Sequence, residues 1–148
     1  MKKFQSLLII VLITTSIILI LYTSIIIRDS NRLKENINEL ETTAFVDFYT
    51  QLENYQFIVS RSLGDNKSYQ YLDDHLSSIN TTYLMFQSTT KLNDTDKNVK
   101  NIDIDYLYKQ LWEDITVDYD NVTKEELNEI INKIENARTE LLKFLPEN

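Results

Sequence analysis

Acidic side chains are the most abundant groups in this chain that could do chemistry. From Asp94 to Asp105, the spacing places Asp94, Asp96 and Asn98 at positions 1, 3 and 5 of a twelve-residue calcium loop, with Asp105 at position 12. The segment departs from an EF-hand because Val99 stands where the sharp turn needs Gly, and Asp105 replaces the longer bidentate Glu. A solvated acidic loop explains these residues better, and weak calcium binding stays an open alternative.

The other side-chain types used in catalysis are scarce. The chain has one His, one Gly and no Cys, which excludes a zinc site, a Cys–His nucleophile pair and a glycine-rich phosphate loop. His75 follows Asp73 and Asp74 and is explained by an exposed helix position. Paired carboxylates for glycoside cleavage need a deep cleft, which a small domain rarely supplies. We therefore expect no catalytic, metal or cofactor site, and no enzyme.

An apolar run near the N-terminus determines where this chain acts. Residues Phe4 to Ile27 contain no charge, no Gly and no Pro, and as a helix they reach roughly 36 Å, enough to cross a bilayer core. Secretory signals have shorter apolar cores that end in a small-residue cleavage site, whereas this run contains no Ala. We predict an uncleaved transmembrane signal-anchor over 4–27. Its Ser and Thr hydroxyls can bond to carbonyls of the same helix.

The charges that flank the anchor predict its orientation. Lys2 and Lys3 stand on one side, and Arg28, Arg32 and Lys34 on the other, so the basic count is nearly balanced. The N-terminal charges directly abut the run, while the other flank is mixed with acidic residues. We expect residues 1–3 to be cytoplasmic and residues 28–148 to be extracytoplasmic. The richness in Ile, Asn and Lys is typical of an AT-rich bacterial genome.

Helical periodicity continues after the anchor. It predicts four helices within 28–148, at about 28–63, 67–91, 103–115 and 124–145, and it predicts polar connections, the longest being 93–101. Gly64 is a natural cap for the first helix, and Thr123 with Glu126 forms a capping box at the last. The first helix should continue the anchor without a break. The fold class is therefore all-α: a transmembrane helix continuing into a small extracytoplasmic bundle of about four helices, the first one long.

Apolar stripes give the expected core of this bundle. In the first helix apolar residues recur about every 3.75 residues, which is helical but not a sustained heptad. The stripe contains Leu33, Ile37, Leu40, Ala44, Phe48, Leu52, Tyr55, Val59 and Leu63. The later stripes contain Leu72, Leu76, Ile79, Tyr83 and Phe86, then Ile104, Leu107 or Tyr108, Leu111 and Ile115, then Leu127, Ile130, Ile131, Ile134, Ala137, Leu141, Leu142 and Leu145. The part of the first helix before about residue 40 is expected to stand clear or to pair with a second copy.

Several large apolar side chains lie off these stripes. Tyr71, Met85, Tyr106 and Trp112 are the candidate interface residues, because exposed aromatic and Met side chains are frequent anchors at protein interfaces. The alternative is that a bundle helix with two neighbours buries them. Without Lys2 and Lys3, 13 basic residues stand against 23 acidic ones, so residues 28–148 carry a net charge of −10. That charge argues against binding to nucleic acid.

These features predict a single-pass membrane protein that acts through protein–protein binding by its extracytoplasmic helical domain, as an envelope-complex accessory or an immunity-type factor. Its expected partners are the membrane and another protein, and homo-oligomers through the long first helix are a further expectation. The alternative is ligand sensing, since the layout is similar to the sensory bundles of chemoreceptors and histidine kinases. Those proteins cross the membrane a second time, so a chain ending at Asn148 would have to report through a partner.

Overall fold

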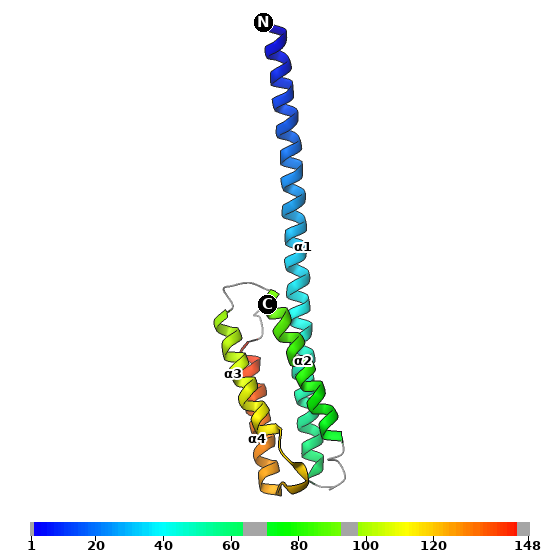
Figure 1. Cartoon of the computed structure of the whole chain (residues 1–148), viewed down its shortest axis with the longest axis vertical. Coiled ribbons are helices and arrows are strands. Elements are labelled where there is room, and N and C mark those ends of the chain that lie inside the picture. Colours follow the sequence, from blue (N-terminus) through cyan, green and yellow to red (C-terminus); the bar gives the residue numbers. More distant parts are fainter. Residues whose placement is uncertain (1, 64–70, 93–97, 145–148) are drawn as a thin grey trace. The chain divides into compact units, whose positions relative to one another are not determined.

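A computed structural model describes residues 2–63, 71–92 and 98–144, all of whose regular elements are helices. They are α1 (Lys2–Ser62), α2 (Leu72–Leu92), α3 (Asn98–Ile115), the short 3₁₀ helix η3 (Tyr119–Asn121) and α4 (Lys124–Leu142) (Figure 1). The predicted all-α class with a long first helix is confirmed. The chain divides into two compact units, Met1–Asn36 and Ile37–Asn148.

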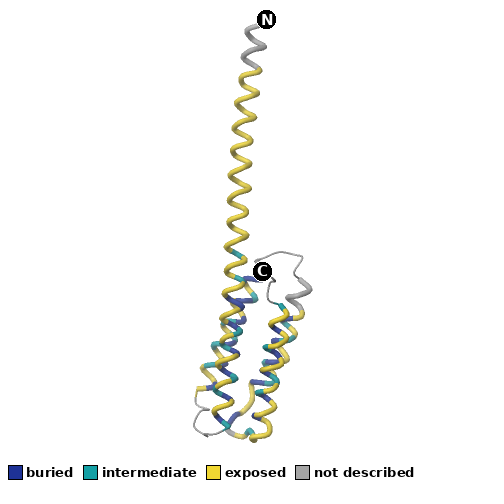
Figure 2. The backbone as a smooth tube through the Cα atoms, turned by 180° about the vertical axis from the view of Figure 1, so that it is seen from behind, coloured by how far each residue is buried: buried dark blue, intermediate teal, exposed yellow. Residues whose placement is uncertain are grey.

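The first unit contains only the N-terminal part of α1. All residues from Ile9 to Ile27 are exposed, and this part of the helix is long and apolar enough to cross a membrane (Figure 2). Its hydroxyls donate to carbonyls four residues earlier, as in the 2.8 Å bonds from Ser16 to Leu12 and from Ser24 to Ile20. These bonds satisfy the polar groups within the helix, as a hydrocarbon environment requires. Because α1 runs on to Ser62, the prediction that the apolar run continues into the next helix without a break is confirmed.

The second unit is a helical bundle with one hydrophobic core. α2 runs back beside the C-terminal part of α1, and α3 packs against α4 (Figure 1). The buried hydrophobic residues are Ala44, Phe45, Phe48, Leu52, Tyr55 and Val59 of α1; Leu72, Leu76, Ile79, Tyr83 and Phe86 of α2; Ile104, Tyr108, Leu111 and Ile115 of α3; Tyr119; and Leu127, Ile130, Ile134, Ala137 and Leu141 of α4. The apolar stripes predicted from the sequence therefore form the core at the positions where another helix covers them.

Three described residues of the expected stripes are exposed. Leu33 and Leu40 are 60% and 50% exposed, since the burial of α1 begins at Ala44. Leu142 is 45% exposed because Leu141 takes the inward position, and the next residue of a helix points about 100° away. Periodicity places a residue on a face, but it does not say how far the covering helices reach.

Two helix boundaries differ from the prediction. α3 begins at Asn98, so the loop expected over 93–101 is wrong for 98–101. These residues are mostly polar but include no Gly or Pro, and polarity alone does not end a helix. α4 ends at Leu142 instead of 145, because the amide of Phe144 donates to Leu141 in a tighter turn, at 2.9 Å. The expected cap Gly64, the start of the second helix at 67 and the loop residues 93–97 lie outside the described residues.

The connection between α3 and α4 contributes a core residue that its turn-rich sequence did not indicate. Tyr119 of η3 is buried, its hydroxyl lies 2.5 Å from that of Tyr55, and it donates to the carbonyl of Ile115 at 2.9 Å. Burial raises the pKa of Tyr119 to about 12 and raises that of Tyr55 further, so both stay protonated. This pair connects η3 to α1 near the C-terminal end of that helix.

The capping box at the start of α4 is confirmed. The Glu126 amide donates to the Thr123 hydroxyl oxygen at 3.2 Å, and the Thr123 amide donates to the Glu126 carboxylate at 2.8 Å. These two bonds satisfy amides that the first turn of a helix leaves without partners. Hydrogen bonds from the Thr123 amide and hydroxyl also hold the pKa of Glu126 below its ordinary value of 4.5.

We expect Thr123→Ala to lower the free energy of unfolding by about 1 kcal/mol, because it removes the cap. Urea unfolding of the full chain in detergent micelles, followed by circular dichroism, measures the change. Thr139→Ala is the matched control, since the exposed Thr139 hydroxyl only donates to a carbonyl of its own helix, that of Glu135.

The cost of Thr123→Ala should also depend on pH. A carboxylate whose pKa is depressed in the folded state adds stability above its unfolded-state pKa, and that stability is lost as pH falls through the folded-state pKa. The difference between wild type and Thr123→Ala should therefore shrink on acidification below about pH 4.5. An unchanged difference across this range would show that the Thr123 hydroxyl does not contribute to the lowered pKa of Glu126.

Candidate interaction surface

Polar side chains between α2 and α3 serve the packing of the bundle. The Tyr83 hydroxyl donates to the Asp105 carboxylate, and the Gln87 amide donates to both oxygens of that carboxylate at 3.0 and 3.1 Å. The Tyr108 hydroxyl donates to the Asn80 side chain at 2.9 Å. Burial, together with the bond to Asp105, raises the pKa of Tyr83. These bonds fix the register of the two helices.

The structure corrects the expectation of a solvated acidic loop from Asp94 to Asp105, because the described part of this segment, residues 98–105, belongs to α3. Asp105 lies inside α3, and both of its carboxylate oxygens accept hydrogen bonds from α2. It is therefore not placed as the last ligand of a calcium loop. Asn98 and Val99 belong to the same helix, while Asp94 and Asp96 lie outside the described residues.

Arg138 joins α4 to α1. Its guanidinium donates to Gln56 at 2.6 Å, to Glu53 at 2.8 Å and to the Tyr49 hydroxyl at 3.2 Å, and it lies 4.7 Å from the centre of the Tyr49 ring. The sequence did not single out this residue, because its partners are more than 80 positions away. The contacts make Arg138 a structural residue, and its remaining donor, Nε, is buried and has no hydrogen-bond partner among the described residues.

The four candidate interface residues lie in different places. Tyr71, Met85 and Tyr106 are 60%, 54% and 63% exposed, and the Tyr106 hydroxyl accepts a 2.9 Å bond from Gln110. Trp112 is half-buried and stacks on Tyr108 with ring centres 5.7 Å apart. Tyr71 directly precedes α2, and Met85 lies within α2. The two residues are 14 positions apart, which is about 21 Å along a helix. The structure therefore does not show all four as one patch.

Met85 belongs to a hollow that the sequence did not indicate. Leu40 of α1 and five residues of α2 line an open hollow of about 430 Å³, and none of them is charged. The lining residues are Leu40, Thr81, Leu84, Met85, Ser88 and Thr89. Leu40, Leu84 and Met85 are each about half exposed, which is unusual for large apolar side chains close to one another. This hollow is the candidate interaction site.

The hollow lies on a face of α2 that carries no charge. Residues 76–90 include no Asp, Glu, Lys or Arg, although 26% of the chain is charged. Five of these residues point away from the core and are exposed, and we call them the α2 face: Ser77, Thr81, Leu84, Met85 and Ser88. Depletion of charge is a property of the central part of protein interfaces.

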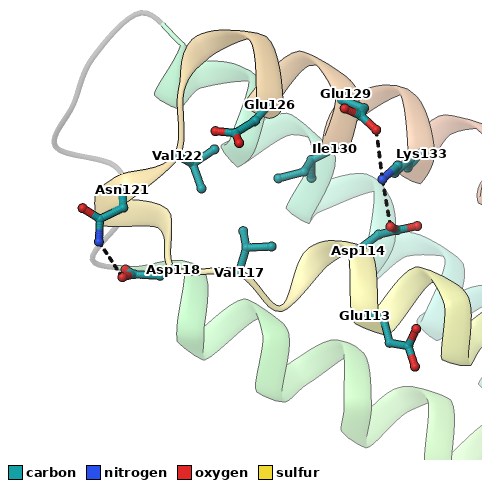
Figure 3. A pocket seen from close by; sticks show the side chains of 10 residues that line it. All are labelled: Glu113, Asp114, Val117, Asp118, Asn121, Val122, Glu126, Glu129, Ile130 and Lys133. Atoms are coloured by element: carbon teal, nitrogen blue, oxygen red, sulfur yellow. Dashed lines mark hydrogen bonds and ion pairs between the residues drawn. The ribbon is translucent and has the colours of Figure 1, made fainter.

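A second hollow, of about 290 Å³, lies between the end of α3 and the start of α4 (Figure 3). Val117, Val122 and Ile130 line its interior, and five carboxylates surround it. Lys133 lies between two of these carboxylates, 2.9 Å from Asp114 and 3.1 Å from Glu129, and these bonds raise its pKa.

The remaining carboxylates around the second hollow are mostly engaged as well. Asp118 accepts a 2.7 Å bond from Asn121, Glu126 belongs to the capping box, and Glu113 points away from the others (Figure 3). Most of the carboxylates around the second hollow therefore already accept hydrogen bonds or ion pairs from other residues of the bundle. Among the described residues, no group of three or more His, Asp or Glu side chains is arranged to hold a metal ion.

Comparison with known proteins found no protein family, no curated protein and no solved structure that matches this chain.

Proposed function

We propose that this chain is a single-pass membrane protein whose extracytoplasmic helical domain acts by binding another protein, as an accessory of an envelope complex or as an immunity-type factor. The observation that carries the proposal is the hollow at Leu40, Leu84 and Met85. Half-exposed apolar side chains line it, outside the cluster of buried residues that forms the core. Binding of a protein there would remove this apolar surface from water, which favours association.

The N-terminal part of α1 supports the anchor. An exposed, uncharged helix over Ile9 to Ile27, whose hydroxyls bond within the helix, suits a lipid environment and would be unfavourable in water. Lys2 and Lys3 before it favour a cytoplasmic N-terminus. The domain that follows the anchor is then extracytoplasmic.

Ligand sensing is the alternative, and the hollow between α3 and α4 is the observation in its favour. Its volume of about 290 Å³ is at the lower limit for small-molecule sites, and Lys133 already neutralises part of its charge. The uncharged hollow at α2 fits a protein surface better, so protein binding remains the first proposal.

Co-purification tests the proposed function. The full chain with an affinity tag, produced together with an untagged copy, cross-linked in the membranes of the producing bacterium and solubilised in detergent, should recover a protein partner in near-equal amount, either a different protein or the untagged copy. The double variant Leu84→Asp with Met85→Asp should lose that partner, because two charges then face an apolar contact. Val46→Asp is the matched control, since Val46 is 49% exposed and lies outside the hollow. A partner recovered equally with all variants would contradict the site, and no partner at all would contradict the function.

A further inference from the structure

We propose that the occupant of the α2 face is a second copy of this chain, so that two anchored copies pair through α2 against α2. The inference rests on the proposed function, because it takes the α2 face to be a protein-binding surface. It differs from pairing through the long first helix, since the contact is placed on the outward side of the second helix.

The charge distribution favours a second copy over another partner. Two copies anchored with the same orientation in one membrane are related by a two-fold axis, which brings the same patch of each copy together. A charged residue on such a patch would face a like charge, which costs several kcal/mol. Residues 28–148 carry a net charge of −10, yet the α2 face has none. It is therefore a surface on which two copies can approach without repulsion.

The side chains of the α2 face suit close contact between helices. Ser77, Thr81, Leu84 and Ser88 follow one another at steps of 4, 3 and 4, the spacing that keeps residues on one side of a helix. The Thr81 hydroxyl donates to Ser77 at 2.9 Å, and the Ser88 hydroxyl donates to Leu84 at 2.7 Å. Because their hydrogen atoms are already bonded within the helix, a second copy can cover these hydroxyls without leaving a donor unpaired.

The hollow that the α2 face lines can accept an apolar side chain of the second copy. Leu40 and Met85 line its apolar surface, and Met adapts readily to a neighbouring surface because its side chain is unbranched and flexible. The five residues of the α2 face are few compared with the roughly 20 to 30 residues that each partner contributes to a stable complex in solution. Anchoring in one membrane raises the effective concentration of the two copies, so that a small contact suffices.

Disulfide cross-linking tests this contact, because the chain contains no Cys. Full-length chains carrying Ser77→Cys or Ser88→Cys are oxidised with copper phenanthroline in the membranes of the producing bacterium. A disulfide needs Cα atoms within about 7 Å. Ser60→Cys is the matched control: Ser60 is also exposed on a helix, and like Ser88 it donates to a carbonyl four residues earlier at 2.7 Å.

We expect the two α2-face variants to form disulfide-linked dimers at least about tenfold faster than Ser60→Cys. Adding Leu84→Asp to either variant should lower its rate of dimer formation to that of the Ser60→Cys control. Rates no higher than that of Ser60→Cys, or rates unaffected by Leu84→Asp, would overturn the pairing. If cross-linking fails while co-purification recovers a different protein that depends on Leu84 and Met85, the pairing is wrong and the proposed function stands. If neither experiment yields a partner, both are wrong.

Discussion

Phe48→Ala is expected to lower the free energy of unfolding by about 3 to 5 kcal/mol. Phe48 is fully buried, and its ring centre lies 5.5 Å from that of Tyr83, 6.4 Å from that of Phe86 and 5.9 Å from that of Tyr108. One side chain of α1 therefore contacts both α2 and α3, so its removal leaves a cavity where three helices meet. Small domains are stable by only about 5 to 15 kcal/mol, so this loss is a large part of the total.

Urea unfolding of the full chain in detergent micelles measures this loss. The fluorescence of Trp112, the only Trp, follows the core because its ring stacks on Tyr108. Phe57→Ala is the matched control: Phe57 is 62% exposed, and its described ring contact is with Arg61, 5.8 Å from the ring centre. We expect the control to cost less than about 1 kcal/mol. Equal losses for the two variants would contradict the position of the core.

The double variant Leu12→Arg with Ile20→Arg is expected to raise the free energy of membrane insertion by about 5 to 7 kcal/mol, since each Arg near the centre of a spanning helix costs about 2.5 to 3.5 kcal/mol. Leu12 and Ile20 are exposed on α1 with no other helix to cover them. The fraction of protein that stays in the membrane pellet after extraction with alkaline carbonate measures the effect. Wild type should stay in the pellet, and the double variant should largely leave it.

Leu33→Arg is the control for this prediction. Leu33 is 60% exposed on the same helix, but it follows the charged residues Arg28 and Arg32, which places it outside the predicted span. This single Arg should leave the protein in the pellet. A double variant that behaved like Leu33→Arg would mean that residues 4–27 do not cross the bilayer.

Local patterns in the sequence predicted the fold. The stripes in α1 from Ala44 to Val59, and those in α2 and α3, matched the buried residues, because an amphipathic helix has to turn its apolar side toward its neighbours. The capping box at Thr123 was predicted because both of its partners lie within four residues. The start of α3 at Asn98 was missed because a polar segment can be either a loop or an exposed first turn of a helix.

Contacts between distant residues could not be predicted in this way. The bonds of Tyr83 to Asp105, Tyr55 to Tyr119 and Arg138 to Glu53 join positions 22, 64 and 85 residues apart. The periodicity of apolar residues does not predict such pairs, because they depend on how the helices pack. The candidate site shows the same limit. Met85 was singled out because it lies off the core stripe, but the hollow also needs Leu40, which the sequence placed at the end of the part of the first helix expected to stand clear or to pair with a second copy.

The central claim is that an uncleaved N-terminal helix anchors an extracytoplasmic helical domain. A single Cys at the exposed position Glu135, in this Cys-free chain, allows labelling of intact cells with a maleimide that does not cross membranes, followed by mass measurement of the protein extracted from the membrane. We expect the Glu135→Cys protein to be labelled on intact cells and to keep residues 1–27 in its mass. A protein labelled only after lysis, or one recovered from the medium without its first residues, would contradict the account.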